Sequence, residues 1–167
     1  MKVLLITTSV LLLAGTAVSA WGGTGPKCPN GWHMYNNTQC LSLFTRQEPW
    51  EEARRQCDFK TSGSDLVIID SAEKNAFVNT LVHSKPPLIS CGLLGIDSYW
   101  IGLNDRRREF WFEWNDTQER GEYRNWGFLE PNNLLGEDCV EMEYDKGKWN
   151  DEDCDSKRCF VCEVAAT

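Results

Sequence analysis

A cluster of oxygen-bearing side chains near the carboxyl end of the sequence is the feature best suited to chemistry. One loop reads GFLEPNNLLGEDC over residues 127–139, and the tripeptide WND follows at 149–151. Calcium is a hard cation that takes six to eight oxygen ligands, which carboxylate and amide side chains supply. Without a cation, the acidic members of this cluster would repel one another. The predicted ligands of a principal calcium ion are Glu130, Asn132, Glu137, Asn150 and Asp151.

The same side chains have the hydrogen-bonding capacity to hold a sugar beside the ion. A carboxylate that ligates calcium can still accept from a hydroxyl, and an amide can donate to one. The hydroxyl oxygen can then ligate the ion, so two adjacent hydroxyls complete its coordination shell. We therefore predict carbohydrate binding by Glu130, Asn132, Glu137 and Asn150. Pro131 lies between two of these ligands, and we expect a cis peptide bond there because a trans bond would direct them apart.

Two other interpretations of the acidic loop are weaker. A solvated surface is the common reason for clustered charges, but these acids alternate with asparagine and proline and are matched by a second segment. A glycosidase would also need paired acids. We expect no enzyme, because the acids are already assigned to a metal and no nucleophile has a base beside it.

The first twenty residues predict export. They carry an early lysine, a short apolar run and a small-residue ending, which is the layout of a signal peptide (1–20) cleaved after Ala20. An uncleaved anchor is the alternative, but polar residues interrupt the run at positions 7–9. No later stretch is apolar enough to cross a bilayer. We expect a secreted, extracellular chain that begins at Trp21 and does not insert into membranes.

The length of the chain limits the number of domains, and its charge limits the classes of partner. Subtracting the 20-residue leader from 167 leaves 147 residues, which is enough for one domain. Loss of Lys2 with the leader changes the formal charge from −8 to −9. Such an acidic chain repels phosphate backbones, so we expect no nucleic-acid partner. The arginines at 106–108 are then most simply a solvated loop.

The cysteines indicate an oxidising compartment. All eight lie beyond the leader, and an even number in an exported chain predicts four disulfides. Zinc is the alternative, but only one CxxC pair occurs, at 159–162. Two Asn-X-Thr triplets make Asn36 and Asn115 candidate glycosylation sites.

The predicted ligands need a scaffold, and the sequence predicts two early helices followed by short strands. A proline and two acids favour a helix over 50–57, and Asp70 with Glu73 makes a capping pair for a second helix that ends before Pro86. Strands are predicted at 66–69, 99–103, 110–114, 139–144 and 159–164. An irregular loop over 115–138 remains, and such loops are usually functional. Six tryptophans are expected to be buried: Trp32, Trp50, Trp100, Trp111, Trp114 and Trp149.

Seven motifs occur in order along the chain: CPNGW (28–32) with Cys40, WEEARRQC (50–57), YWIGLND (99–105), NWGFLEPNN (125–133), GEDC (136–139), WNDEDC (149–154) and FVCE (160–163). Together they resemble a C-type lectin domain over residues 28–164, between a short segment at 21–27 and a tail at 165–167. The resemblance implies an α+β C-type lectin-like fold: two helices and two small antiparallel sheets, with a long calcium-binding loop and disulfide staples. The bridges it implies are Cys28–Cys40, Cys57–Cys162 and Cys139–Cys154.

The resemblance also implies an auxiliary calcium site at Asp105, Glu109 and Asp138, although Asn133 stands where the family often has an acid. Two cysteines are left over, Cys91 and Cys159. They either pair with each other or join two chains, and we favour the internal bridge. A homo-oligomer remains open, although the chain has neither a collagen repeat nor a heptad run.

The tripeptide at 130–132, Glu-Pro-Asn, resembles the mannose-type signature of the family, whereas the galactose type usually carries Gln-Pro-Asp. The signature implies recognition of equatorial hydroxyls, as in mannose, glucose and N-acetylglucosamine, and of a related diol in fucose. We thus expect a calcium-dependent lectin for glycans on cell surfaces or glycoproteins. Two alternatives stay open: a galactose-type lectin despite this tripeptide, and a calcium-binding matrix protein that uses the fold without binding sugar.

Overall fold

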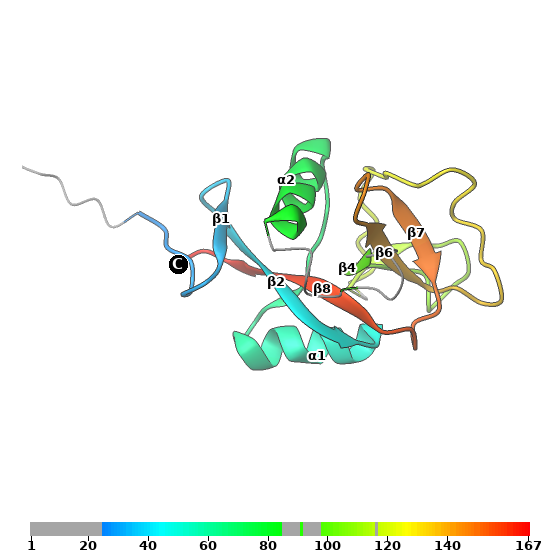
Figure 1. Cartoon of the computed structure of the whole chain (residues 1–167), viewed down its shortest axis with the longest axis horizontal. Helices are drawn as coiled ribbons and strands as arrows, with labels where there is room; N and C mark the ends of the chain where they lie inside the picture. Colours follow the sequence, from blue (N-terminus) through cyan, green and yellow to red (C-terminus); the bar gives the residue numbers. More distant parts are fainter. Residues whose placement is uncertain (1–24, 85–90, 92–97, 116) are drawn as a thin grey trace, which may run out of the picture.

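The computed structural model describes residues 25–84, 91, 98–115 and 117–167 (Figure 1). The predicted signal peptide and the predicted end of the second helix at Pro86 lie outside these residues. The elements follow in the order β1 (His33–Tyr35), β2 (Gln39–Glu48), α1 (Trp50–Lys60), β3 (Asp65–Leu66), α2 (Ala72–His83), β4 (Ser98–Asn104), β5 (Glu113–Trp114), β6 (Cys139–Glu143), β7 (Trp149–Glu152) and β8 (Arg158–Ala165).

The strands form one mixed sheet in which two antiparallel groups meet. Its order is β1-β2-β8-β4-β6-β7, with β3 paired to β8 and β5 paired to β4. Strands β2 and β8 are antiparallel, with Leu43 opposite Val161. Strands β4 and β8 are parallel, with Trp100 opposite Phe160. The two antiparallel groups expected from the sequence are therefore joined through a parallel pair. Helices α1 and α2 lie on opposite sides of the β2–β8 ribbon (Figure 1).

Both helices form where the sequence predicts them, but the start of α2 differs in detail. Helix α1 begins directly after Pro49 and buries Trp50, Ala53 and Cys57 on one face. The N-cap of α2 is Ser71, whose hydroxyl accepts from the backbone N–H of Lys74 at 3.2 Å. The predicted capping pair of Asp70 and Glu73 is therefore one residue out of register. An N-cap side chain serves a donor two or three residues on, and Ser71 occupies that position.

Indole rings make up much of the core and also fix backbone segments. Trp50, Trp100 and Trp149 are completely buried. The indole N–H of Trp50 donates to the carbonyl of Ile101 at 2.9 Å, and that of Trp100 donates to the carbonyl of Glu48 at 2.9 Å. Each of these two buried rings thus satisfies its one donor while holding a second segment of backbone in place.

The strand predicted at 110–114 is mostly wrong, and with it the burial of Trp111. Only Glu113 and Trp114 pair with β4, while Trp111 keeps 42% of its surface exposed. Hydrogen bonds turn the chain before the strand: Arg108 N–H donates to Asp105 O at 2.8 Å, and Trp111 N–H donates to Arg108 O at 2.9 Å. Trp111 consequently lies on a turn at the surface.

The sequence analysis did not predict strands β1, β2 and β7, and the strand that it predicted at β3 extends too far toward the carboxyl end. Strand β2 buries Cys40, Leu41 and Leu43, a run that breaks the simple alternation of a half-buried strand. The predicted strand at 66–69 has regular ladder pairing only as far as Leu66. Val67 N–H still donates to Val161 O at 2.9 Å.

Four disulfides use all eight cysteines: Cys28–Cys40, Cys57–Cys162, Cys91–Cys159 and Cys139–Cys154. Cys91 and Cys159 therefore bridge within the chain, and no thiol is left for zinc. The two ends of the described domain also meet. Lys27 N–H donates to Thr167 O at 2.7 Å, and Thr167 N–H donates to Lys27 O at 3.1 Å.

None of the described helices has the length and apolar character needed to cross a membrane.

A buried ion pair connects α2 to β8. Lys74 is completely buried, and its ammonium lies 2.6 Å from Glu163 Oε2 and 5.7 Å from the ring centre of Tyr35. Burial raises the pKa of Glu163, and the charge of Lys74 opposes that rise. Removing one partner of such a pair leaves an uncompensated buried charge.

We predict that Lys74→Met lowers the free energy of unfolding by about 3 kcal/mol, because Glu163 loses its counter-ion. The double variant Lys74→Met/Glu163→Leu should recover most of this loss, since neither charge then stays buried. Chemical denaturation of both variants at pH 7 measures the difference. Equal destabilisation of the single and double variants would contradict the role assigned to the pair.

Candidate functional site

The predicted principal ligands come from two segments that the fold places side by side. Glu130, Asn132 and Glu137 lie on the long loop, while Asn150 and Asp151 lie on β7, which pairs antiparallel with β6. The alternation of β7 buries Trp149 and Asp151 and leaves Asn150 half-buried between them. A short strand thus brings the Asp151 carboxylate to the loop and holds the Asn150 amide beside it in the sequence.

Asp151 is the link between strand and loop. Its Oδ1 accepts from the backbone N–H of Asn132 at 3.0 Å, and its Oδ2 accepts from that of Asn133 at 2.8 Å. Hydrogen bonds to an ionised carboxylate are roughly twice as strong as neutral ones. One buried side chain therefore fixes two consecutive residues of the segment that carries Glu130 and Asn132.

The segment Glu130-Pro131-Asn132 presents an acid and an amide together. Its Glu130–Pro131 peptide bond is cis, as expected. The side-chain amide of Asn132 donates to Glu130 Oε2 at 2.7 Å. Asn132 is exposed and Glu130 is partly exposed, so both keep oxygen atoms accessible to solvent.

Glu137 holds the next part of the loop through two hydrogen bonds. Its Oε2 accepts from the backbone N–H of Leu134 at 2.8 Å, and its own N–H donates to Asn133 Oδ1 at 2.9 Å. Asn133, which departs from the family pattern at the auxiliary site, therefore has a structural role in this loop. Its φ of 48° lies in the left-handed region, which asparagine tolerates better than most residues.

Glu141 and Arg158 support Asn150, and the sequence alone did not identify them. Asn150 Nδ2 donates to Glu141 Oε1 at 3.4 Å, and Glu141 Oε2 accepts from Arg158 Nε at 2.6 Å and from Ser98 Oγ at 2.7 Å. Burial raises the pKa of Glu141, an effect that Arg158 and Ser98 oppose. The only sequence signal was an acid at a core-facing position of the segment CVEMEY.

Trp149 anchors the loop through backbone contacts. Gly127 N–H donates to Trp149 O at 2.8 Å, and Trp149 N–H donates to Asn125 O at 3.0 Å. The buried indole donates to Asn75 Oδ1 on α2 at 2.8 Å. The predicted burial of Trp149 is confirmed.

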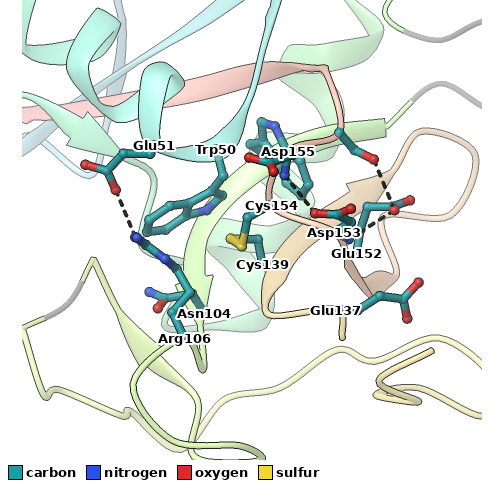
Figure 2. Close-up of a disulfide and its surroundings, with 12 residues drawn as sticks. Trp50, Glu51, Asn104, Arg106, Glu137, Cys139, Glu152, Asp153, Cys154 and Asp155 are labelled. Atoms are coloured by element: carbon teal, nitrogen blue, oxygen red, sulfur yellow. Dashed lines mark hydrogen bonds and ion pairs between the residues drawn. A yellow bond between two sulfur atoms is a disulfide. The ribbon is translucent and has the colours of Figure 1, made fainter. Parts of the chain in front are cut away.

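The disulfide Cys139–Cys154 ties the end of the loop to the chain after β7. Figure 2 shows it beside Trp50, with Glu137 on the segment that leads to it and the Glu137 carboxylate directed away from it. Cys139 belongs to the buried core cluster around Trp50, and the partly buried Cys154 packs against it. The loop is thus fastened covalently at the base and by hydrogen bonds along its length.

Negative charge accumulates at the principal site. Burial raises the pKa of Glu130, and the adjacent Asp151 and Glu137 add to the rise against the hydrogen bond from Asn132. Burial also raises the pKa of Glu137, with further contributions from Asp151, Glu152 and Glu141. A divalent cation would relieve this repulsion, and the oxygen-only donor set suits calcium.

The auxiliary trio is also drawn together. Asp105 is 1% exposed, and burial together with the charges of Glu109 and Asp138 raises its pKa to about 7. Its Oδ2 accepts from Phe110 N–H at 2.7 Å, whereas the buried Oδ1 has no hydrogen-bond donor among the described residues. Burial and the charge of Glu109 likewise raise the pKa of Asp138. An oxygen without a donor beside two further carboxylates fits a cation.

Neither group is preassembled as a metal cage. Across the described ranges, no three histidine, cysteine, aspartate or glutamate side chains come together in a group that could hold a metal ion. At the principal site, the carboxylates of Asp151 and Glu137 accept from backbone N–H groups of the loop. A cation there would also need the side-chain oxygens of Asn132 and Asn150, and calcium accepts such mixed oxygen ligands.

The rim of the principal site is apolar and exposed. The large apolar side chains on either side of the tripeptide at 130–132 retain between 64% and 99% of their surface, namely Phe128, Leu129, Leu134 and Leu135. Trp126 is only half-buried, and its ring lies edge-to-face with that of Phe112 at a centroid distance of 4.8 Å.

Comparison with known proteins decides the family. The model described as Lectin C-type domain matches residues 46–164. The chain belongs to the C-type lectin domain family. It is 32% identical over 159 residues to C-type lectin lectoxin-Lio1 of Erythrolamprus poecilogyrus, which covers 93% of this chain and 91% of that protein. It is 33% identical over 135 residues to versican core protein of Rattus norvegicus, which covers 79% of this chain but only 4% of that protein.

A solved structure supports the same C-type lectin fold. The C-type carbohydrate-recognition domain of cow CD23, determined in the presence of a GlcNAc2Man3 oligosaccharide, superimposes with a TM-score of 0.71. It is 31% identical, and the match covers 85% of this chain and 98% of that domain. The α+β C-type lectin-like fold with two helices is therefore confirmed.

The two candidate glycosylation sites differ in access. Asn36 is exposed, and its Oδ1 accepts from Thr38 Oγ1 at 2.6 Å. Asn115 is only 7% exposed, and its Nδ2, the atom that would carry a glycan, donates to Leu66 O at 2.7 Å.

We predict that the chain, secreted from eukaryotic cells, carries a glycan at Asn36 and none at Asn115. Glycopeptide mass spectrometry before and after enzymatic deglycosylation locates the modified asparagine. Substantial occupancy of Asn115 in folded protein would show that the Leu66 contact does not protect this side chain.

Proposed function

We propose that this C-type lectin domain is secreted and binds sugars of the mannose type through a calcium ion held by Glu130, Asn132, Glu137, Asn150 and Asp151. One observation carries the proposal: Asp151 on β7 holds the backbone of the loop that displays Glu130 and Asn132. This contact supports an arrangement in which oxygen-donating side chains from the loop and from β7 hold one ion. In the bound state, calcium would supply coordination positions for two adjacent sugar hydroxyls.

The residues of the chain would orient the sugar. Glu130 and Glu137 can accept from hydroxyl groups, and the amides of Asn132 and Asn150 can donate to them. The contact between Asn132 and Glu130 places a donor and an acceptor next to each other, as recognition of a vicinal diol requires. Burial of Trp149 and support from Glu141 restrict the movement of Asn150.

The preference for mannose-type sugars follows from the order of acid and amide in the tripeptide at 130–132. The oligosaccharide present with the cow CD23 domain, which contains N-acetylglucosamine and mannose, is consistent with this preference. Asp105, Glu109 and Asp138 would hold the auxiliary ion. Because Asp105 N–H donates to Asp138 O at 3.0 Å, that ion would stiffen the base of the loop.

A glycan array tests this function directly. The mature chain is applied with millimolar calcium and, in parallel, with a chelator. Calcium-dependent binding to mannose, glucose, N-acetylglucosamine or fucose is the expected result. Calcium-dependent binding confined to galactose would support the galactose-type alternative, and calcium uptake without any glycan would support a matrix role.

We predict that calcium stabilises the domain at pH 7 and loses this effect on acidification. Extracellular calcium sites have dissociation constants of roughly 10⁻⁴ to 10⁻³ M, so 10 mM calcium should add about 1 to 3 kcal/mol to the free energy of unfolding. Protons compete for Glu130 and Glu137, whose pKa values are raised above 4.5. The calcium increment and sugar binding should therefore fall together as the pH drops through those raised values, while the fold persists.

Without calcium, the free energy of unfolding should depend on pH in the opposite direction. Because both pKa values are higher in the folded state than in the unfolded chain, the ionised carboxylates destabilise the fold at neutral pH. Without calcium, their contribution should become more favourable as the pH falls toward 4.5. Thermal denaturation at several pH values, with calcium or chelator, resolves the two trends. An undiminished calcium increment in Glu130→Gln/Glu137→Gln would place the stabilising ion outside the principal site.

We predict that Glu130→Gln/Asn132→Asp shifts the sugar preference toward galactose. The double variant exchanges acid and amide while keeping the net charge, so calcium affinity should change little. Competition with mannose and galactose measures the ratio of affinities. Glu119→Gln/Asn37→Asp makes the same chemical changes at exposed positions outside the site and should leave the ratio unaltered. An unchanged ratio in the first variant would refute the assignment of specificity to this tripeptide.

A further inference from the structure

A positively charged aromatic cluster lies on the turn between β4 and β5 and at the start of the long loop. Trp111 has the guanidinium of Arg108 at 4.7 Å from its ring centre and that of Arg120 at 3.9 Å. All three residues are exposed. We call them the Arg108–Trp111–Arg120 cluster. The cluster stands out because the chain as a whole has a formal charge of −8.

The two arginines of the cluster have no carboxylate partner in the part of the chain that the structure describes. Their neighbours do: Arg107 pairs with Glu113 at 3.2 Å, and Arg106 pairs with Glu51 at 2.8 Å. Figure 2 shows Arg106 turned toward Glu51 and Trp50. The arginines at 106–108 were expected to form a solvated loop. Arg106 and Arg107 instead pair with carboxylates, and Arg108 lies over the ring of Trp111.

The turn that carries the cluster is preorganised. Asp105 O accepts from Arg108 N–H at 2.8 Å, Arg108 O accepts from Trp111 N–H at 2.9 Å, and Asp105 Oδ2 accepts from Phe110 N–H at 2.7 Å. These contacts fix the spacing between Arg108 and Trp111. Stacking on the indole then restricts each guanidinium, so less side-chain entropy is lost when it binds a ligand.

Stacked guanidinium groups retain their hydrogen-bonding edges. A guanidinium that lies over an aromatic ring can keep the N–H donors in its own plane free for a ligand, and both groups lie within 5 Å of the Trp111 ring centre. Such a fork matches the paired oxygens of a carboxylate or sulfate, and these charge-assisted bonds are among the strongest that side chains form. Burial lowers the pKa of Arg124, and the charge of Arg120 lowers it further, so Arg120 is close enough to act on a third guanidinium.

The cluster and the proposed sugar site share their supporting segments. The turn begins at Asp105, whose N–H donates to Asp138 O next to Glu137, and Arg120 lies on the same loop as Glu130. We propose that the Arg108–Trp111–Arg120 cluster is a second, calcium-independent binding site for the sulfate or carboxylate groups of an acidic saccharide. The proposal rests on the proposed function only in taking the ligand to be a saccharide.

Binding of polysaccharides to the mature chain in a chelator tests the site separately from the calcium-dependent one. Dextran sulfate and polygalacturonate present the two anionic groups, and neutral dextran is the uncharged control. Binding to at least one anionic polymer, and none to neutral dextran, is expected. Arg108→Gln/Arg120→Gln should weaken it at least about tenfold through the loss of charge-assisted hydrogen bonds. Added salt should weaken it as well.

Matched variants distinguish binding at this specific cluster from general attraction of the ligand to positive charge. Arg46→Gln/Arg55→Gln removes the same charge from other exposed arginines and should change the affinity by less than about twofold. Trp111→Ala keeps the charge but removes the stacking surface, and should weaken binding several-fold. Glu130→Gln/Glu137→Gln should not weaken this binding, whatever it does to mannose binding.

Three results would overturn the proposal. They are the absence of binding to either anionic polysaccharide, equal losses in the two arginine pairs, and equally tight binding of a single-stranded DNA of matched charge. Circular dichroism of every variant confirms that its fold is intact. Failure of calcium-dependent mannose binding alone would refute the proposed function and leave the acidic-saccharide site standing.

Discussion

A long irregular loop inside a compact domain must find partners for its backbone groups, and in this protein β7 supplies them. Asp151 accepts from two consecutive N–H groups, and the backbone of Trp149 bonds on both sides to the segment around Trp126. Unpaired buried backbone groups are costly, so the loop keeps its shape only while β7 stays in the sheet. Burial of Trp149 holds β7 in the sheet, and β7 in turn maintains the geometry of the proposed sugar site.

This arrangement gives several side chains two tasks. Asp151 and Glu137 organise the loop through N–H donors, and the same carboxylates are proposed calcium ligands. Each carboxylate oxygen has more than one lone pair, so a hydrogen bond and a metal contact can coexist. Burial raises the pKa values of Glu130 and Glu137, neighbouring carboxylates add to the rise, and a cation bound there would relieve this unfavourable charge.

The sequence predicted those features that depend on local patterns or chemical type. Helix α1, the position of α2 and the oxygen-rich segments could all be reached in that way, whereas the internal pairing of Cys91 rested on the bridges that the family resemblance implies. Strand β2 could not, because its apolar residues do not alternate strictly with polar ones. Trp111 was expected in the core because of the strand predicted at 110–114, whereas the bonds from Arg108 N–H to Asp105 O and from Trp111 N–H to Arg108 O form a turn that leaves it at the surface. Glu141 gains its supporting role only from the tertiary contact with Asn150.

The hydrogen bonds between Lys27 and Thr167 bring the two ends of the domain together, on the side of the molecule away from the long loop (Figure 1). A domain with adjoining ends can be inserted into another polypeptide, or attached to a solid support by either end, with little disturbance of its fold. In both arrangements the loop faces outward. The number of binding sites in an assembly then depends on what is joined to the two ends of the domain. Several weak sites can be combined in this way without changing the domain itself.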